Sequence, residues 1–280
     1  MPIEAGKHGL LDRRNYFFYS ETAMVIIYFL LAFTATICGS MAGLGGGVII
    51  KPVLDTLGLD GLQTISVLSS ATVFSMALVS TIRQVISGFK LENRMIFLAA
   101  GAAIGGIFGG QLFSTISATM NTQTLKGVQA VILTILLIIV LFKNKLPDWE
   151  IKNLFVSSAT GIILGALAAF LSIGGGPINV AILCMFLSMK VKDAAVVSIL
   201  IILLSQGAKL MLIGLDTGFS VYAGMDKLVY MIPGGIIGGL TGTRLNRKLS
   251  HAFIDRFFTI MIVCIICLNI FNAVDAFFFG

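Results

Sequence analysis

A run of three glycines interrupts a long apolar segment at two matching places in this chain. The first interruption lies in GSMAGLGGGVIIKPVL (39–54), and the second lies in ALAAFLSIGGGPINVAIL (166–183). Glycine is a poor helix former, so such a run leaves backbone N–H and C=O groups free. In lipid those groups need partners, and a broken helix survives at membrane depth only where it lines a cavity or is covered by protein. Paired breaks in corresponding positions therefore indicate the substrate site of a transporter.

The composition places the chain in a membrane. Of its 280 residues, 57% are hydrophobic and only 11% are charged, whereas soluble domains carry about 25% charged residues. Apolar segments recur at 22–41, 46–57, 65–87, 95–113, 125–142, 153–172, 177–188, 194–214, 228–244 and 255–275. Most of them approach the spanning length of about 20 residues. We expect a multi-pass protein of the cell (inner or plasma) membrane whose main partner is the lipid bilayer.

The chain divides into two similar halves. GLGGGVII from Gly43 aligns with SIGGGPIN from Ser172, and LAAGAAIGGIFGGQL from Leu98 aligns with MIPGGIIGGLTGTRL from Met231. The predicted organisation is an N-terminal surface segment at 1–21, a first transmembrane repeat at 22–142, a polar cytoplasmic linker at 143–152 and a second repeat at 153–280. The small residues spaced four apart in the second block allow helices to approach closely.

The loop charges favour inverted repeats. If each broken segment is a hairpin that enters and leaves on one side, most loop lysines and arginines fall on the cytoplasmic side; if each crosses once, they divide almost evenly. The predicted fold class is an all-α polytopic membrane protein with two inverted repeats. Each repeat has a glycine-tipped broken helix or re-entrant hairpin and three transmembrane helices. Both termini are then outside.

The glycine tips are candidate binding sites for an anion. The N-terminus of a half-helix presents free N–H groups and a partial positive charge, and two such ends from inverted repeats would converge on one ligand. The alternative is that the glycines only let two backbones cross closely. The candidate contacts at the tips are Gly45, Gly46, Gly47, Gly174, Gly175, Gly176, Ser172 and Asn179.

Lys209 is the one basic residue that the sequence places well inside a spanning segment. A buried charge in a membrane faces a cavity or a partner by default, although Lys209 lies near the segment's end and could instead extend to the interface. Its neighbours Ser205 and Gln206 precede it by about one turn. The matching helix of the first half offers Ser69, Ser70 and Thr72 as further polar contacts, although serines in helices also bond to their own backbone.

Several classes of site are missing from the sequence. No Asp or Glu lies well inside a confident span, and there is no nucleotide-binding G-x-x-x-x-G-K-[ST] or hydrolase motif. The C-x-x-C of Cys264 and Cys267 stands alone in an apolar segment and is taken as structural. We therefore expect no enzyme activity, no cofactor, no metal and no nucleic-acid partner. A small anionic substrate is expected, and a homodimer is left open.

The motifs resemble a known family. GLGGGVIIKPVLDTLGL, its partner SIGGGPINVAIL, and the blocks IGGIFGGQL and IGGLTGTRL are similar to the TauE/SafE family of sulfite and organosulfonate exporters. In the second half, Pro177 directly follows the glycines and Ala181 stands where the first half has Pro52. The resemblance implies secondary export of sulfite, sulfoacetate or a related sulfonate by alternating access. The alternatives are an anion channel, a transporter of another small organic anion, and an intramembrane sulfur-relay component.

Overall fold

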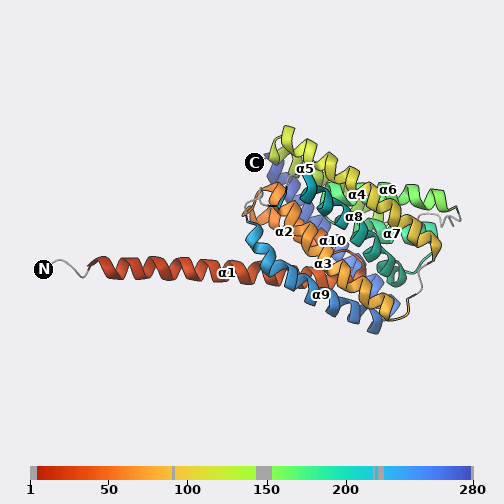
Figure 1. Cartoon of the computed structure of the whole chain (residues 1–280), viewed down its shortest axis with the longest axis horizontal. Helices are drawn as coiled ribbons and strands as arrows, with labels where there is room; N and C mark the ends of the chain where they lie inside the picture. Colours follow the sequence, from red (N-terminus) through yellow and green to blue (C-terminus); the bar gives the residue numbers. More distant parts are fainter. Residues whose placement is uncertain (1–4, 90–91, 143–152, 217, 220–223, 279–280) are drawn as a thin grey trace.

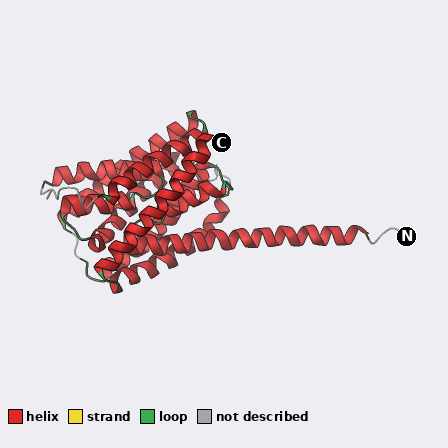
Figure 2. Cartoon of the chain, turned by 180° about the vertical axis from the view of Figure 1, so that it is seen from behind, coloured by secondary structure: helices red, strands yellow, loops and turns green. Residues whose placement is uncertain are grey.

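The computed structural model describes residues 5–89, 92–142, 153–216, 218–219 and 224–278, and in this part of the chain it is helical throughout (Figure 1, Figure 2). Seven of the described helices are long and apolar enough to cross a membrane. The helices are α1 (Ala5–Ala42), α2 (Gly47–Leu57), α3 (Leu62–Ile86), α4 (Asn93–Thr119), α5 (Thr122–Leu141), α6 (Leu154–Leu171), α7 (Gly176–Leu187), α8 (Val191–Asp216), the 3-10 turn η3 (Met225–Lys227), α9 (Leu228–Lys248) and α10 (His251–Phe278).

Each predicted apolar segment corresponds to a helix, and the all-helical membrane fold is confirmed. Helix α9 is not among the seven candidate spans, and its last turn carries Arg247 and Lys248. The region predicted as a surface segment at 1–21 belongs from Ala5 onward to α1, whose N-terminal part projects beyond the bundle in Figure 1. The predicted linker at 143–152 lies outside the described residues.

The first broken segment is a hairpin. The Tyr28 hydroxyl, about four turns before the break, donates a hydrogen bond to Asp60, which lies just after α2. A single crossing would separate these residues by the height of the membrane, so α2 returns along α1. Lys227 of η3 joins the same cluster through hydrogen bonds to Asp60 and Tyr28. Partial burial lowers the pKa of Lys227, but the two hydrogen bonds together with the charge attraction of the same two partners outweigh it, so the net pKa is raised.

The fourth helix of each half packs on the other half. Helix α4 lies against α6 and α8, and α9 lies against α1 and α3. A Cβ on Gly105 would overlap the Ile162 carbonyl of α6, and a Cβ on Gly238 would overlap Phe33 and Thr36 of α1. The aligned glycine blocks are therefore the surfaces at which the helix backbones touch. This exchange of helices holds the two halves in one bundle and brings both glycine breaks to its interior.

Candidate anion-binding site

The two glycine breaks meet at the centre of the bundle. A Cβ on Gly47 would overlap the Ile173 carbonyl of the other break, and a Cβ on Gly176 would overlap the Leu44 carbonyl. The first residue of α2 and the first residue of α7 therefore each pack against the backbone of the opposite break. Only glycine leaves room for this crossing, which explains the third glycine of each run.

The first two glycines of each run have a different role. Gly45 and Gly46 have φ of 80° and 58°, and Gly174 and Gly175 have φ of 78° and 70°. This left-handed backbone reverses the chain between the helices, and L side chains rarely adopt it. The residue two places before the first of these glycines is left-handed too: Gly43 in the first break and Ser172 in the second.

Two serines each donate a hydrogen bond to the glycine break of the opposite half. Ser69 of α3 donates a hydrogen bond to the Ser172 carbonyl at 3.0 Å, and Ser198 of α8 donates one to the Gly43 carbonyl at 2.8 Å. Ser69 and Ser198 stand at the same position in the two halves, as Gly43 and Ser172 do. The contacts around the breaks thus come in matched pairs, which supports the sequence repeat.

One side of this crossing holds a buried cation. The Lys209 ammonium donates hydrogen bonds to the hydroxyls of Ser66 at 2.8 Å, Ser70 at 3.1 Å and Ser172 at 2.8 Å. Ser66 and Ser172 are themselves 2.7 Å apart. Lys209 is fully buried, and its ammonium also lies 5.2 Å from the centre of the Phe113 ring. The cluster joins α3, α8 and the start of the second break.

The charge of Lys209 is not balanced by a carboxylate within the described part of the chain. The ion pairs found there are Lys51–Asp55, Arg94–Glu92 and Lys227–Asp60. Hydroxyl groups solvate an ammonium but do not neutralise it, and an isolated charge in a low-dielectric interior is costly. An anion bound here would offset that cost, so the cluster favours negatively charged ligands.

Two buried amides lie near the same crossing without hydrogen-bond partners. The side chains of Asn179 and Gln206 are both fully buried, and neither amide forms a hydrogen bond in the structure. A Cβ on Gly175 would lie 3.2 Å from the Asn179 side-chain oxygen, so this amide adjoins the second glycine tip. Gln206 lies one turn from Lys209 on α8. Buried amides without partners are uncommon and indicate room for a polar ligand or water.

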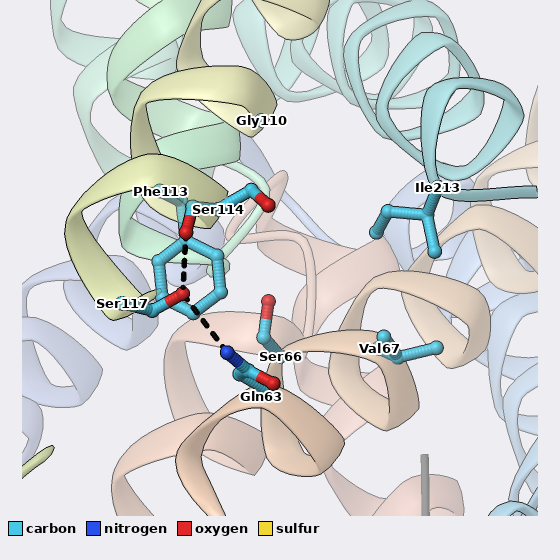
Figure 3. A pocket seen from close by; sticks show the side chains of 8 residues that line it. All are labelled: Gln63, Ser66, Val67, Gly110, Phe113, Ser114, Ser117 and Ile213. Carbon is cyan, nitrogen blue, oxygen red and sulfur yellow. Dashed lines mark hydrogen bonds between the residues drawn. The ribbon is translucent and has the colours of Figure 1, made fainter. Parts of the chain in front are cut away.

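A small cavity adjoins the lysine cluster (Figure 3). Its volume of about 20 Å³ suits a single water molecule. Ser66 and Phe113 form its inner part, and both contact Lys209. Toward the end of the bundle where α3 begins and α4 ends, Gln63 donates a hydrogen bond to Ser117 across the cavity (Figure 3). The cavity therefore lies between this end of the bundle, named here the Gln63 end, and the residues that contact the lysine.

The structure brings together only some of the predicted residues. Ser70 and Ser172 contact Lys209, and Ser69 binds the Ser172 carbonyl. Thr72 bonds to the Leu68 carbonyl of its own helix, and Ser205 bonds to that of Ile202. Their hydroxyls therefore serve their own helix backbone. Whether the glycine N–H groups bind a ligand stays a prediction.

The sequence reasoning missed two features. Ser66 lies at the centre of the lysine cluster, and its position four residues before Ser70 could have shown that both face the same way. Lys51 was not among the predicted site residues, but it is 4% exposed and forms an ion pair with Asp55 at 2.6 Å within α2. Lys209 is therefore not the sole buried base. The Lys51–Asp55 spacing of four on a helix was the available signal.

A comparison with models of known families matches residues 28–268 to the sulfite exporter TauE/SafE. This chain belongs to the TauE/SafE family. The match covers most of the chain and both glycine breaks, so the resemblance read from the motifs is confirmed. As a TauE/SafE protein it is a multi-pass membrane transporter of the sulfite-exporter class. The corresponding comparisons with curated proteins and with solved structures give no match.

Proposed function

We propose that this chain exports a small sulfur-containing oxyanion, such as sulfite, sulfoacetate or a related sulfonate, and that the Lys209 cluster binds it. The observation that carries the proposal is a fully buried ammonium held by three hydroxyls, without a carboxylate partner among the described residues. An oxyanion can accept hydrogen bonds from the ammonium and from serine hydroxyls that turn toward it.

The neighbouring groups suit such a ligand. Ser172 belongs to the second glycine tip, where the first N–H groups of α7 have no helical partner by the geometry of a helix start. Asn179 and Gln206 add amide donors that are unused in this structure. Three kinds of donor thus surround one region, as several oxygens with dispersed charge would require.

The proposed mechanism is alternating access between two inverted repeats. The hairpin of α1 and α2, the matched contacts at the two breaks and the exchanged positions of α4 and α9 support it. A membrane potential that is negative inside favours anion export by ~2.3 kcal/mol per charge per 100 mV. Export of this kind needs no coupling cation.

The test is uptake into proteoliposomes containing the purified protein. Sulfite, sulfate, thiosulfate, sulfoacetate and short carboxylates would be compared, with Lys209→Met beside the wild type. We expect saturable sulfite or sulfonate flux, reduced at least about tenfold by Lys209→Met because the main charge contact is lost. Lys190→Gln, which removes an exposed positive charge, is the control and should transport normally.

Three results would count against the proposal or a part of it. Normal flux in correctly inserted Lys209→Met protein would remove the lysine from the binding site. Flux that does not saturate and shows no exchange between internal and external anion would favour a channel. Preference for a short carboxylate over every sulfur anion would keep the site but change the substrate class.

A further inference from the structure

The residues around the small cavity have counterparts at the opposite end of the bundle. Gly106 of α4 packs on Ser205 of α8, and its counterpart Gly239 of α9 packs on Met76 of α3. These matched contacts relate α4 to α9 and α3 to α8. In the same register, the cavity residues Gln63, Gly110, Phe113, Ser114 and Ile213 correspond to Lys192, Thr243, Asn246, Arg247 and Gln84.

At each end of the bundle, a side chain at the start of α3 or α8 donates a hydrogen bond to the end of α4 or α9. At the Gln63 end, the Gln63 amide at the start of α3 donates to Ser117 near the end of α4 at 3.1 Å. At the opposite end, named here the Lys192 end, the Lys192 ammonium at the start of α8 donates to two carbonyls at the end of α9. These are the carbonyls of Leu249 at 3.0 Å and Arg247 at 3.3 Å.

The position behind the Lys192 contact is closed. Asn246, the counterpart of Phe113, is 3% exposed and donates a hydrogen bond to the Met41 carbonyl at 2.7 Å, next to the first glycine break. Thr243, one turn deeper, is fully buried. At the Gln63 end the corresponding place holds the small cavity lined by Ser66 and Phe113, which contact Lys209.

The two ends differ in charge. Gln63 and Ser114 are neutral, whereas their counterparts Lys192 and Arg247 are cations. The ion pairs formed by the described residues include neither of them. Arg247 is exposed and donates to the Ser87 hydroxyl at 2.7 Å. Lys192 and Arg247 thus donate hydrogen bonds to carbonyl and hydroxyl groups. An anion can replace these groups as the acceptor.

We propose that Lys192 and Arg247 form the entry site for the small oxyanion at the Lys192 end. The site becomes complete when Lys192 releases the two α9 carbonyls and the path beside Asn246 and Thr243 opens. The inference rests on the proposed transport function and adds the end of the bundle from which the anion enters. The anion enters past two cations and leaves past the neutral Gln63 and Ser117, so the protein binds it more readily from the Lys192 end.

The first experiment measures sulfite uptake from each end. In protein whose native cysteines are replaced, Ser117→Cys provides a thiol in the cavity, and a membrane-impermeant thiol reagent silences molecules whose Gln63 end faces the outside. The remaining uptake reports the Lys192 end. We expect Lys192→Gln to raise the KM for sulfite from this end about tenfold and to change the KM from the Gln63 end less than twofold. Lys190→Gln is the charge-matched control and should change neither KM.

The second experiment does not depend on transport. Thr243→Cys places a thiol on the closed path, and its rate of labelling by the same reagent should rise in Lys192→Gln because the contact with α9 is lost. It should stay at the wild-type rate in Lys190→Gln. Lys192→Arg, which can still reach the carbonyls, should keep both the low labelling rate and the low KM.

The two failures are distinguishable. If the protein does not transport or bind any sulfur anion, the proposed function is wrong, and the entry site is rejected with it even if Thr243→Cys labelling changes. If sulfite transport is normal but Lys192→Gln alters the KM no more than Lys190→Gln does, the entry site alone is overturned.

Discussion

The two glycine breaks share a backbone but differ in their side chains. Both reverse the chain with left-handed residues, and both place a glycine against the carbonyl of the other break. The second break has Ser172 where the first has Gly43, and α7 has Asn179 where α2 has Ile50. The features shared by the two backbones therefore form the crossing, and the side chains that differ between the breaks form the candidate binding site.

The charged residues also differ between the two halves. The position of Lys209 is occupied in the first half by Ser80, which bonds to the Gly239 carbonyl at 3.3 Å. The first half instead carries Lys51 and Asp55, which neutralise each other within α2. The paired charges of Lys51 and Asp55 favour a ligand of neither sign, whereas the charge of Lys209, unpaired among the described residues, is the basis for the proposed anion site.

The largest expected effect tests what the two breaks share. Gly47→Ala and Gly176→Ala should each destabilise the protein by about 3 kcal/mol or more, because the added Cβ overlaps a backbone carbonyl that cannot move aside. Thermal unfolding in detergent measures the change. Gly61→Ala adds the same group in open space and should have little effect. Tolerance of either crossing substitution would contradict the close approach of the breaks.

The next largest effect tests a side chain that differs between the two breaks. Ser172→Ala should weaken sulfite binding about tenfold, because it removes a hydroxyl shared by the ammonium and the anion. Ser157→Ala is a suitable control, since Ser157 is equally buried but bonds only to its own helix. Isothermal titration with sulfite compares them. Equal affinities in both variants would place the anion away from the second break.

Replacing Asn179 should raise the stability of the protein but lower its transport activity. Replacing an unsatisfied buried amide by an apolar group of similar size removes a desolvation cost, so Asn179→Leu should stabilise the protein by about 1–2 kcal/mol. Sulfite transport should fall in the same variant because the amide no longer meets the anion. Unfolding and uptake would be measured on one preparation. Greater stability together with full transport would remove Asn179 from the site.

The smallest effect checks the symmetry itself. Ser69→Ala and Ser198→Ala each remove one hydrogen bond to the break of the opposite half and should cost about 1 kcal/mol apiece. The Ser198 hydroxyl also lies 3.3 Å from the Gly176 carbonyl, but its single proton serves mainly the nearer Gly43 carbonyl. Denaturation midpoints of the two variants should agree within error. A clear difference would show that one break depends more strongly on its serine than the other.

The sequence was sufficient for the helices and for the breaks, because both depend on local properties. Apolar length predicted the long helices, and three adjacent glycines predicted where α1 and α6 end and the short helices α2 and α7 begin. Lys209 stood out because a charge in an apolar run is visible without a structure. Ser66 did not, because its importance arises only when α3, α8 and the second break come together. The ion pair of Lys51 was hidden for another reason: α2 is too short to be recognised as membrane-buried by length alone.

The exchange of α4 and α9 between the halves has a consequence for biosynthesis. The surface of α1 that packs on Gly234, Gly238 and Gly242 is synthesised long before its partner α9, because helices α2 to α8 lie between them in the chain. Helix α6 meets α4 as soon as it is inserted, because α4 is already present. Until α9 is inserted, the serine and threonine face of α1 lacks the helix that covers it in the folded protein. The α1–α9 interface of this transporter therefore forms later in synthesis than the α4–α6 interface.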